Sequence, residues 1–428
     1  MTPLSMMFLV LFIALFIGIP VGFSIGISTM TFLLMNNSKL VIMVMRSVDG
    51  AKSFTLMALP LFVFAGALMA YGSTPRLMKL ANLLLRKIPG GLGATAMAAC
   101  GFFGAVSGSG VASTAAIGGI IGHEMVRQGY SKGITASLIA AGGTMASLIP
   151  PSIVMVVYAA SAGVSVGDMF LAGFGPGILT ILALIGLNML IAIKRKTINQ
   201  VQEYTSQEKR KIVIDALLPL MMPVVIIGGV LSGLTTPTEA AVIATVYALA
   251  LAVFVYRELN FRQFMRVASE SVVTSAVILM IIGFATPFGW IMATQNVPQM
   301  FTKALLAFTN SNVMILIIFF ALLLFLGCFM ETICIIILMT PILLPITTAI
   351  GIHPVHWGIA LLMNLAVGGI TPPLSVCLFT SCRILKMRVE ETFPDLLYVI
   401  LTVTLVAVVT LAWPDLSMFL VRMFGSKV

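Results

Sequence analysis

Most of this chain consists of apolar runs that approach the ~20 residues a helix needs to cross the ~30 Å hydrocarbon core of a bilayer. Only 9% of its 428 residues are charged, whereas a soluble domain usually carries about 25%. No water is available inside a bilayer, so each run must pair its backbone groups internally. Because continuous strand patterns are absent, we expect an all-α polytopic membrane protein.

The basic residues lie in short segments between the apolar runs, and the formal net charge is +10. This distribution is typical of the cytoplasmic loops of membrane proteins, so we expect a lipid bilayer as partner and no nucleic acid. The five cysteines lie mostly inside apolar runs without histidines at metal-ligand spacing, which predicts a packing role. No basic segment or cleavage site accompanies the first run, which we interpret as a retained span.

The apolar runs and their flanking charges predict the order of the crossings. Run 4–35 is interrupted at Gly18-Ile19-Pro20, which predicts either one strongly tilted span or two short ones. Further single spans are predicted at 54–71, 169–193, 212–231, 240–256, 267–292 and 396–412. Segment 39–52 is predicted to be a loop, and the count of crossings places it outside although it carries three basic residues.

Two apolar runs suggest re-entrant hairpins. Basic residues flank run 92–121 on both sides, so both of its ends should face the cytoplasm. We therefore predict a hairpin over about 92–125 that opens to the cytoplasm, with a tip rich in Gly and Ser at 104–110. Run 312–350 has no basic cluster at either end and carries Gly327 and Glu331 near its middle. It predicts a second hairpin, which opens to the periplasm.

A Pro-Pro pair interrupts the span that follows each hairpin. Pro150-Pro151 lies within 134–160, and Pro372-Pro373 lies within 357–382. Each proline removes a backbone hydrogen bond and clashes with the preceding turn, so both spans should be broken helices. We therefore expect two repeats of inverted topology, residues 1–211 and 212–428, each with one hairpin and one broken helix.

Broken helices at membrane depth have a chemical consequence. Irregular backbone is tolerated there only where it is buried in protein or lines a cavity. The carbonyl groups freed before each break can hold a cation, whereas the amides of the half-helix beyond it favour an anion. Paired interruptions in two inverted halves indicate the midplane site of a transporter. The alternative is that the prolines only kink the helices.

Five stretches of the sequence resemble the large membrane subunit of tripartite ATP-independent periplasmic (TRAP) transporters. They cover most of the chain in the order of that family, as GAVSGSGVASTAAIGG at 104–119, GTMASLIPPSIVMVVY at 143–158, GLTTPTEAAVIATVYAL at 233–249, FGWIMATQNVPQ at 288–299 and NLAVGGITPPLSVCLF at 364–379. The sequence departs from the family at Met330-Glu331-Thr332, where Glu-Pro-Thr is frequent.

The resemblance implies a sodium-driven importer of small organic anions, such as sialic acid or C4-dicarboxylates, in the bacterial inner membrane. It implies an elevator motion, in which the hairpins and broken helices form a transport domain that moves against a scaffold. The expected partners are a small four-helix membrane subunit, a periplasmic substrate-binding protein and a small carboxylated substrate. We expect Na⁺ as the coupling ion, no organic cofactor and no enzymatic activity. The chain looks like the large subunit alone, without the small subunit fused to it.

Because Na⁺ prefers hard oxygen ligands and the hairpin tips lack carboxylate clusters, we expect carbonyl and hydroxyl ligands. The candidate sodium-binding residues are Ser107, Gly108, Ser109, Ser147, Ile149 and Ser152 in the first half, and Gly327, Gly368, Thr371 and Leu374, through its carbonyl, in the second. The candidate substrate-binding residues are Ser107, Ser109, Pro150, Pro151, Glu331, Thr371, Pro372 and Pro373. Alternatively, the small residues serve close helix packing and Glu331 caps the tip of its hairpin.

Other polar residues have simpler interpretations. Thr236-Pro-Thr-Glu239 predicts a capping box at a helix start, and His123 with Glu124 predicts a solvated edge. An intramembrane enzyme built on Ser107 is a rival hypothesis, but His123 lies at the wet end of the hairpin and no HExxH motif exists. A passive channel is the second rival, and the sequence leaves it open.

Overall fold

The computed structural model describes residues 2–52, 54–197, 203–309, 311–373 and 375–425, and every regular element among them is helical. The all-α fold expected from the sequence is therefore confirmed. The first apolar run forms two short helices, α1 (Pro3–Phe16) and α2 (Val21–Met35), rather than one long helix. Gly18, with a φ of +88°, lies in the turn between them, in the left-handed conformation that glycine adopts readily.

The expectation of a loop at 39–52 is wrong, because this segment contains helix α3 (Val41–Ala51). Its exposed apolar side chains recur at helical spacing, at Val41, Val44, Met45 and Val48. A helix with one apolar and one charged face suits the surface of a membrane. Helix α3 packs along α12 (Phe261–Thr294), which also contacts α2.

Helix α4 (Phe54–Leu85) changes direction where the sequence predicts the end of a span. Tyr71 and Gly72 have non-helical backbone angles, and Gly72 has a φ of +83°. Beyond this break, Arg76 pairs with Glu258 at 3.0 Å and its guanidinium lies 3.8 Å from the centre of the Tyr256 ring. Helices α10 (Ser206–Leu231) and α11 (Pro237–Ala250) pack against α4, and α11 continues as a π-helical turn (Leu251–Val255).

The two predicted hairpins are present as helix pairs. Hairpin 1 consists of α5 (Gly91–Ser107) and α6 (Gly110–Arg127), and hairpin 2 consists of α14 (Asn312–Phe329) and α15 (Thr332–Ala349). Helix α13 (Val297–Phe308) precedes hairpin 2 and contacts both α12 and α15.

Both predicted helix breaks are also present. The first broken helix consists of α7 (Lys132–Ala146) and α8 (Ile153–Ala162), and the second consists of α16 (Pro354–Gly368) and α17 (Val376–Leu385). Helix α9 (Val166–Arg195) follows the first, and a 3-10 turn (Val389–Thr392), α18 (Asp395–Ala412) and α19 (Asp415–Phe424) follow the second. In the described part of the chain, eight helices are long and apolar enough to span a membrane, namely α4, α9, α10, α11 with its extension, α12, α14, α15 and α18.

Three pairs of features in the two halves begin at the same spacing along the chain. Helices α6 and α15 begin at 110 and 332, α7 and α16 begin at 132 and 354, and the Pro-Pro pairs begin at 150 and 372. The contacts also correspond, because α6 touches α17 as α15 touches α8, and α7 touches α18 as α16 touches α9. This pattern is compatible with two inverted repeats. Their opposite orientation and the boundary at 211/212, which falls inside α10, stay predictions.

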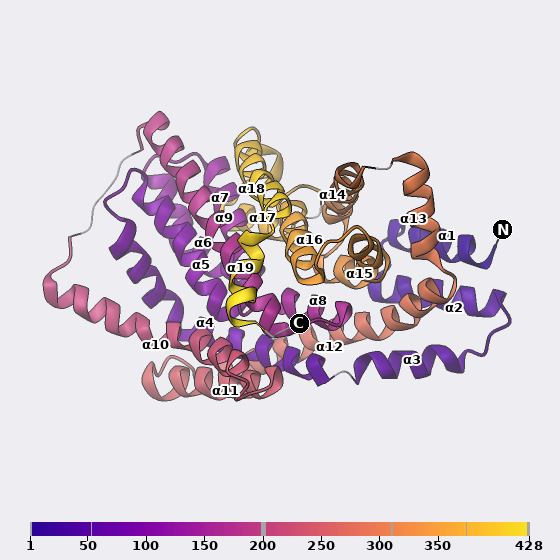
Figure 1. The fold of residues 1–428 in the computed structure, drawn as a ribbon. Helices are drawn as coiled ribbons and strands as arrows, with labels where there is room; N and C mark the ends of the chain where they lie inside the picture. The colour runs from indigo at the N-terminus through magenta and orange to yellow at the C-terminus, as the bar shows by residue number, and fades with distance from the viewer. Residues whose placement is uncertain (1, 53, 198–202, 310, 374, 426–428) are drawn as a thin grey trace.

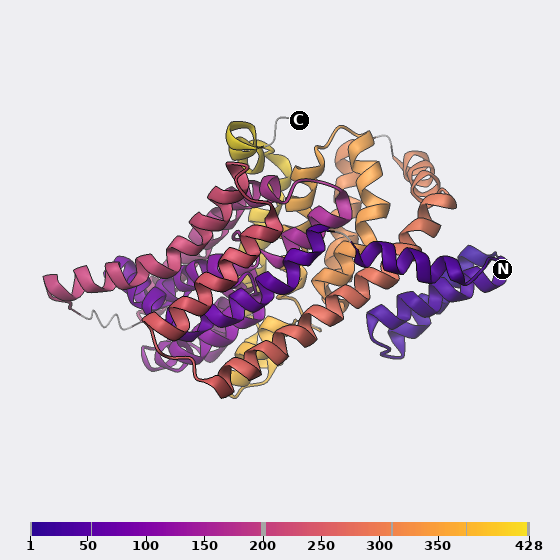
Figure 2. The same cartoon turned by 90° about the horizontal axis from the view of Figure 1, so that it is seen from below.

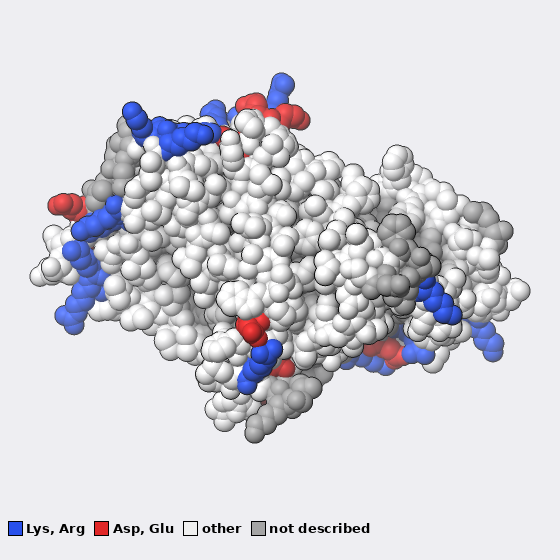
Figure 3. All heavy atoms as spheres, turned by 45° about the horizontal axis from the view of Figure 1, so that its top comes forward, with Lys and Arg blue, Asp and Glu red and all other residues white. Residues whose placement is uncertain are grey.

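Parts of both broken helices lie between two groups of other helices. In Figure 1, α8 and α16 lie between α10 and α11 at the lower left and α1, α2 and α13 at the right. Figure 2 shows the N-terminal helices beside the far end of the long helix α12, with which α2 and α3 are in contact. In Figure 3, Lys and Arg lie along the left and upper edges, and further charged side chains lie at the lower middle and the lower right. The broad middle between them carries neither basic nor acidic side chains. This uncharged middle suits contact with lipid.

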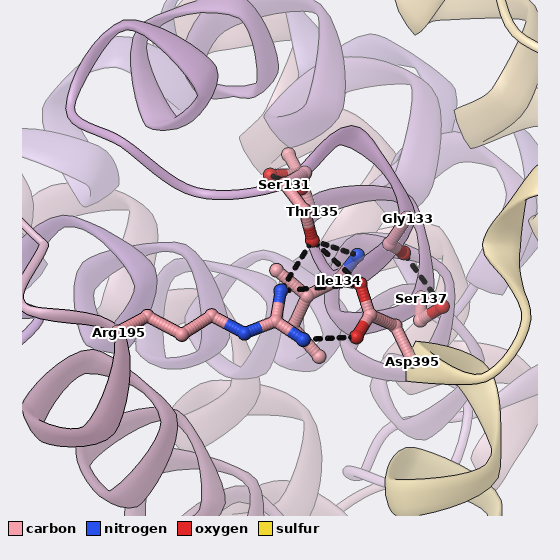
Figure 4. Close-up of polar contacts among 7 residues, drawn as sticks. All are labelled: Ser131, Gly133, Ile134, Thr135, Ser137, Arg195 and Asp395. Atoms are coloured by element: carbon pink, nitrogen blue, oxygen red, sulfur yellow. Dashed lines mark hydrogen bonds and ion pairs between the residues drawn. The ribbon is translucent and has the colours of Figure 1, made fainter.

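A polar cluster joins the ends of three of these helices (Figure 4). Arg195, the last residue of α9, pairs through Nη2 with Oδ1 of Asp395 and donates from Nη1 to Oδ2 at 3.3 Å. The same Nη1 donates to Oγ of Ser131 at 2.6 Å, and Ser131 donates to Oδ2 of Asp395 at 2.5 Å. Ser131 also caps α7 by accepting from the amide of Ile134 at 3.2 Å. The cluster therefore connects α7 and α9 of the first half to α18 of the second.

Candidate functional site

A cavity of about 410 Å³ lies where both hairpin tips and both helix breaks meet. Its volume falls within the range of small-molecule sites, about 300–1,000 Å³. The lining of this central cavity comes from both hairpins, both broken helices and α12, at Gly108, Ser109, Gly110, Val111, Thr144, Ser147, Ile153, Val154, Thr274, Ile278, Gly327, Met330, Glu331, Thr332, Ile333, Gly369, Val376 and Cys377. The sequence-based expectation that tips and breaks converge agrees with this arrangement.

The tip of hairpin 1 packs closely against α4 on one side and against the first helix break on the other. Gly108 has a φ of +62°, and a Cβ atom on it would lie 2.9 Å from the carbonyl oxygen of Pro151. On the other side, a Cβ atom on Gly66 of α4 would lie 2.4 Å from the carbonyl oxygen of Ser107. Ser109 caps α6 by accepting from the amide of Ala112 at 3.4 Å. Glycine is therefore required where this backbone is closely approached.

The tip of hairpin 2 forms without the proline that the related family often carries. Met330 is extended, and Glu331 is the N-cap of α15, where its Oε2 accepts from the amides of Ile333 at 2.9 Å and Cys334 at 3.4 Å. Glu331 thus caps the tip and also lines the central cavity. Behind the tip, a Cβ atom on Gly368 would lie 2.6 Å from Cα of Gly327, so two glycines make this contact.

A serine side chain makes a hydrogen bond across each helix break. Ser152 donates its hydroxyl to the carbonyl of Ser147, and Ser375 donates to the carbonyl of Gly369 at 2.6 Å. Ser147 and Gly369 end the two half-helices before the breaks and occupy corresponding positions. These bonds satisfy carbonyl groups that the proline pairs leave without helical partners. Sequence reasoning missed Ser375, although a serine directly before a half-helix is a recognisable N-cap signal.

Four half-helices begin at the central cavity, and their N-termini are not equivalent. Ser109 caps α6, Glu331 caps α15, and Ser375 caps α17 by accepting from the amide of Leu378 at 3.3 Å. Ser152 precedes α8, but its side chain makes no cap hydrogen bond. Among the described ends at this cavity, α8 therefore presents its first amides without a side-chain acceptor, and both Ile153 and Val154 line the cavity.

A second, much smaller cavity adjoins hairpin 1. It has a volume of about 10 Å³, close to the space that one water molecule requires. Its walls comprise tip and break residues together with three apolar side chains, at Ser107, Gly108, Pro151, Ser152, Ile153, Phe62, Val106 and Met222. Residues of the tip and the break that carry hydroxyl and carbonyl oxygens thus line a space that fits one small ion or water molecule, although most of its surface is apolar.

The structure distributes the predicted site residues over three environments. Gly108, Ser109, Ser147, Gly327 and Glu331 line the central cavity, and Ser107, Pro151 and Ser152 join Gly108 at the small cavity. Gly368 packs behind the second tip, and Ile149 is a buried side chain that faces Gly101 and Gly177. Neither cavity has Pro150, Thr371, Pro372 or Pro373 in its described lining, and Leu374 lies outside the described residues.

Several lining residues were not anticipated. Thr144 and Cys377 lie one turn from the expected positions, and Thr274 and Ile278 come from α12, which no sequence signal connects to the hairpins. The hydroxyl of Thr371, in the second break, donates to the carbonyl of Val367 in the last turn of α16 at 2.8 Å.

The simpler interpretations of the other polar residues are confirmed. The amide of Thr236 donates to Glu239 at 2.8 Å and the amide of Glu239 donates to Thr236 at 3.3 Å, which is a capping box. Glu124 pairs with Arg127 at 3.4 Å, and His123 is exposed at the end of α6 remote from the tip. No group of three or more metal-ligating side chains occurs among the described residues.

Comparison with known proteins gives consistent results. The family profile described as "Tripartite ATP-independent periplasmic transporter, DctM component" matches residues 8–416. The chain is 39% identical over 368 residues to the isethionate TRAP transporter permease protein DctMQ of Oleidesulfovibrio alaskensis, covering 86% of this chain and 58% of that relative.

Two further relatives match nearly end to end. The large permease protein SiaM of the sialic acid TRAP transporter of Vibrio cholerae is 34% identical, over 92% of this chain and 93% of its own. The large permease protein DctM of the C4-dicarboxylate TRAP transporter of Pseudomonas aeruginosa is 36% identical, over 90% and 92%. A crystal structure of the YdaH transporter of Alcanivorax borkumensis has a similar fold, with a TM-score of 0.61, 17% identity and coverage of 87% and 88% of the two chains.

Proposed function

Because this chain belongs to the DctM component family of tripartite ATP-independent periplasmic transporters, an inner-membrane permease family, we propose that it imports small organic anions with a sodium gradient. The observation that carries the proposal is the central cavity, where four half-helix N-termini and two helix breaks meet. The relatives are named for isethionate, sialic acid and C4-dicarboxylates, all of which are acids. A small organic acid delivered by a periplasmic binding protein is therefore the substrate class.

The substrate anion binds at the start of α8. None of the described residues that line the central cavity is Lys, Arg or His, so backbone dipoles must supply the positive potential. The N-termini of α6, α15 and α17 already have side-chain caps, whereas α8 has none and its first two residues line the cavity. Glu331 places a carboxylate at the opposite tip, which directs the anionic group of the substrate toward α8.

Sodium binds at the small cavity beside hairpin 1. The residues Ser107, Gly108, Pro151 and Ser152, which carry hydroxyl and carbonyl oxygens, line a volume that fits one small ion. Since the tip and the break each contribute to this cavity, a bound ion would hold the two together and so shape the adjoining anion site. A second sodium ion at Gly327, Gly368, Thr371 and Leu374 is the corresponding proposal for the other half.

Import proceeds by an elevator motion of the hairpins and broken helices. They contact α4 and α12 of the surrounding scaffold, and α12 contributes Thr274 and Ile278 to the wall of the central cavity. A sliding transport domain would exchange these wall residues for others along α12. A small four-helix membrane subunit and a periplasmic binding protein complete the transporter.

The proposal is tested by uptake into proteoliposomes that contain this chain, its small subunit and its binding protein. Radiolabelled isethionate, sialic acid and succinate serve as probes, each with and without an inward sodium gradient. We expect uptake of at least one probe to require the gradient. Uptake that ignores the gradient would indicate a passive channel, and hydrolysis without uptake would indicate an enzyme.

Replacing Ser107 with Ala should raise the Na⁺ concentration for half-maximal uptake several-fold, because one oxygen at the small cavity is lost. Ser137→Ala is the matched control, since Ser137 is a buried serine of α7 whose hydroxyl donates to Gly133 at 2.8 Å outside either described cavity lining. Uptake is measured against Na⁺ concentration at fixed substrate. Unchanged sodium activation in Ser107→Ala would remove this residue from the proposed sodium site.

A further inference from the structure

A pocket of about 240 Å³ lies at the end of hairpin 1 that is remote from its tip. Its walls come from the second part of α4, the start of α5, the end of α6 and Tyr204, which precedes α10. We call it the base pocket. It shares no lining residue with the central cavity or the small cavity and lies outside the proposed transport site.

One part of the lining of the base pocket is polar, and we call this part the rim. Lys79, Asn82 and Tyr204 line it, and the hydroxyl of Tyr204 donates to Oδ1 of Asn82 at 3.1 Å. The guanidinium of Arg86 lies 4.9 Å from the centre of the Tyr204 ring, so a second positive charge stands beside the rim.

The remaining lining is mostly apolar, and we call it the floor. It includes Met78, Leu92, Ile120 and Ile121, and Ile120 of α6 is 50% exposed. A polar, basic rim beside an apolar floor matches a ligand that has an anionic head and a hydrocarbon tail.

The basic residues near the base pocket differ in their partners. Arg76, earlier on the same helix, pairs with Glu258. Lys79 is exposed and has no ion-pair partner among the described residues. Two acids flank Tyr204 in the chain. Glu203 directly precedes it and is exposed, and the carboxylate of Glu208 accepts from the amide of Thr205 at 2.7 Å in a capping box.

We propose that the base pocket binds an anionic phospholipid, with its phosphate at Lys79 and beside Arg86 and an acyl chain over Leu92, Ile120 and Ile121. Basic pockets between transmembrane helices are a recognised setting for anionic lipid headgroups. A soluble anion would leave the apolar floor exposed to water, whereas an acyl chain covers it. The lipid would contact α4 and both helices of hairpin 1, and so would hold the base of the hairpin against the surface part of α4.

The test is native mass spectrometry of the purified, delipidated protein after incubation with equal amounts of phosphatidylglycerol and phosphatidylcholine of the same acyl composition. We expect the wild type to retain one phosphatidylglycerol at least threefold more than phosphatidylcholine. Lys79→Gln should remove this preference. The matched control is Lys132→Gln, because Lys132 is an exposed lysine at the start of α7 outside the base pocket.

A second variant and a competitor separate the remaining outcomes. Ile120→Gln makes the floor polar without changing charge, and it should lower retention of both lipids at the pocket. Inorganic phosphate at millimolar concentration should not displace phosphatidylglycerol. Displacement by phosphate would overturn the lipid assignment in favour of a soluble anion, and equal losses in Lys79→Gln and Lys132→Gln would show a diffuse surface attraction instead of a site.

Discussion

Replacing Ile153 with Pro should raise the substrate concentration for half-maximal uptake by about ten- to hundredfold. Ile153 is the first residue of α8, where proline is accepted in a helix and removes only an amide proton. Ser152 has φ −131° and ψ 135°, the extended conformation that a residue before proline prefers. Losing one hydrogen bond to a charged group costs about 1.5–3 kcal/mol, and each 1.4 kcal/mol is about a factor of ten.

The structure provides a matched control for this variant in the other half of the chain. Val376 is the first residue of α17 and also lines the central cavity, but Ser375 already caps that helix. Val376→Pro should therefore change the half-maximal concentration about threefold or less. Ile153→Ala measures the contribution of the side chain alone. Equal effects of the two proline variants, or a full loss in Ile153→Ala, would contradict anion binding at the start of α8.

The broken helices and hairpins were predictable because their signals are local. Proline pairs interrupt a helix wherever they stand, and a run of Gly and Ser between two apolar stretches marks a tip. The observed helix ends at Ala146 and Gly368 precede the two proline pairs by a few residues, as expected. The expectation of a loop at 39–52 was wrong because the apolar residues of this segment recur at helical spacing between its charged residues, which is typical of an amphipathic helix.

The differences between the halves were not predictable from the sequence. Serines stand near both breaks, and nothing in their spacing shows that Ser375 caps α17 whereas Ser152 gives its hydrogen bond only to Ser147. That difference depends on the backbone angles at each break. Thr274 reaches the cavity through the packing of α12, a long-range contact that no local pattern encodes.

Replacing Asp395 with Ala should lower the free energy of unfolding by about 2–4 kcal/mol, because it leaves a half-buried guanidinium without its partner. The Asp395 side chain is 10% exposed and that of Arg195 is 35% exposed, so water recovers part of the loss at arginine. Ser131 loses the acceptor of its hydroxyl in the same variant. The measurement is denaturant-induced unfolding in detergent micelles, followed by helical circular dichroism.

A double-mutant cycle with Arg195→Met separates the ion pair from the loss of packing. The double variant should be destabilised less than the two single variants together, because neither charge is then left alone. Glu270→Ala is the control for an exposed pair, because the side chains of Arg266 and Glu270 are 76% and 64% exposed and their paired atoms are 2.8 Å apart. This variant should lower the free energy of unfolding by about 0.5 kcal/mol or less. Two results would mean that this cluster does not hold α7, α9 and α18 together. One is that the effects of the two single variants on the free energy of unfolding are additive. The other is that Asp395→Ala lowers this free energy no more than Glu270→Ala does. Other contacts would then have to hold the first broken helix to α9 and α18.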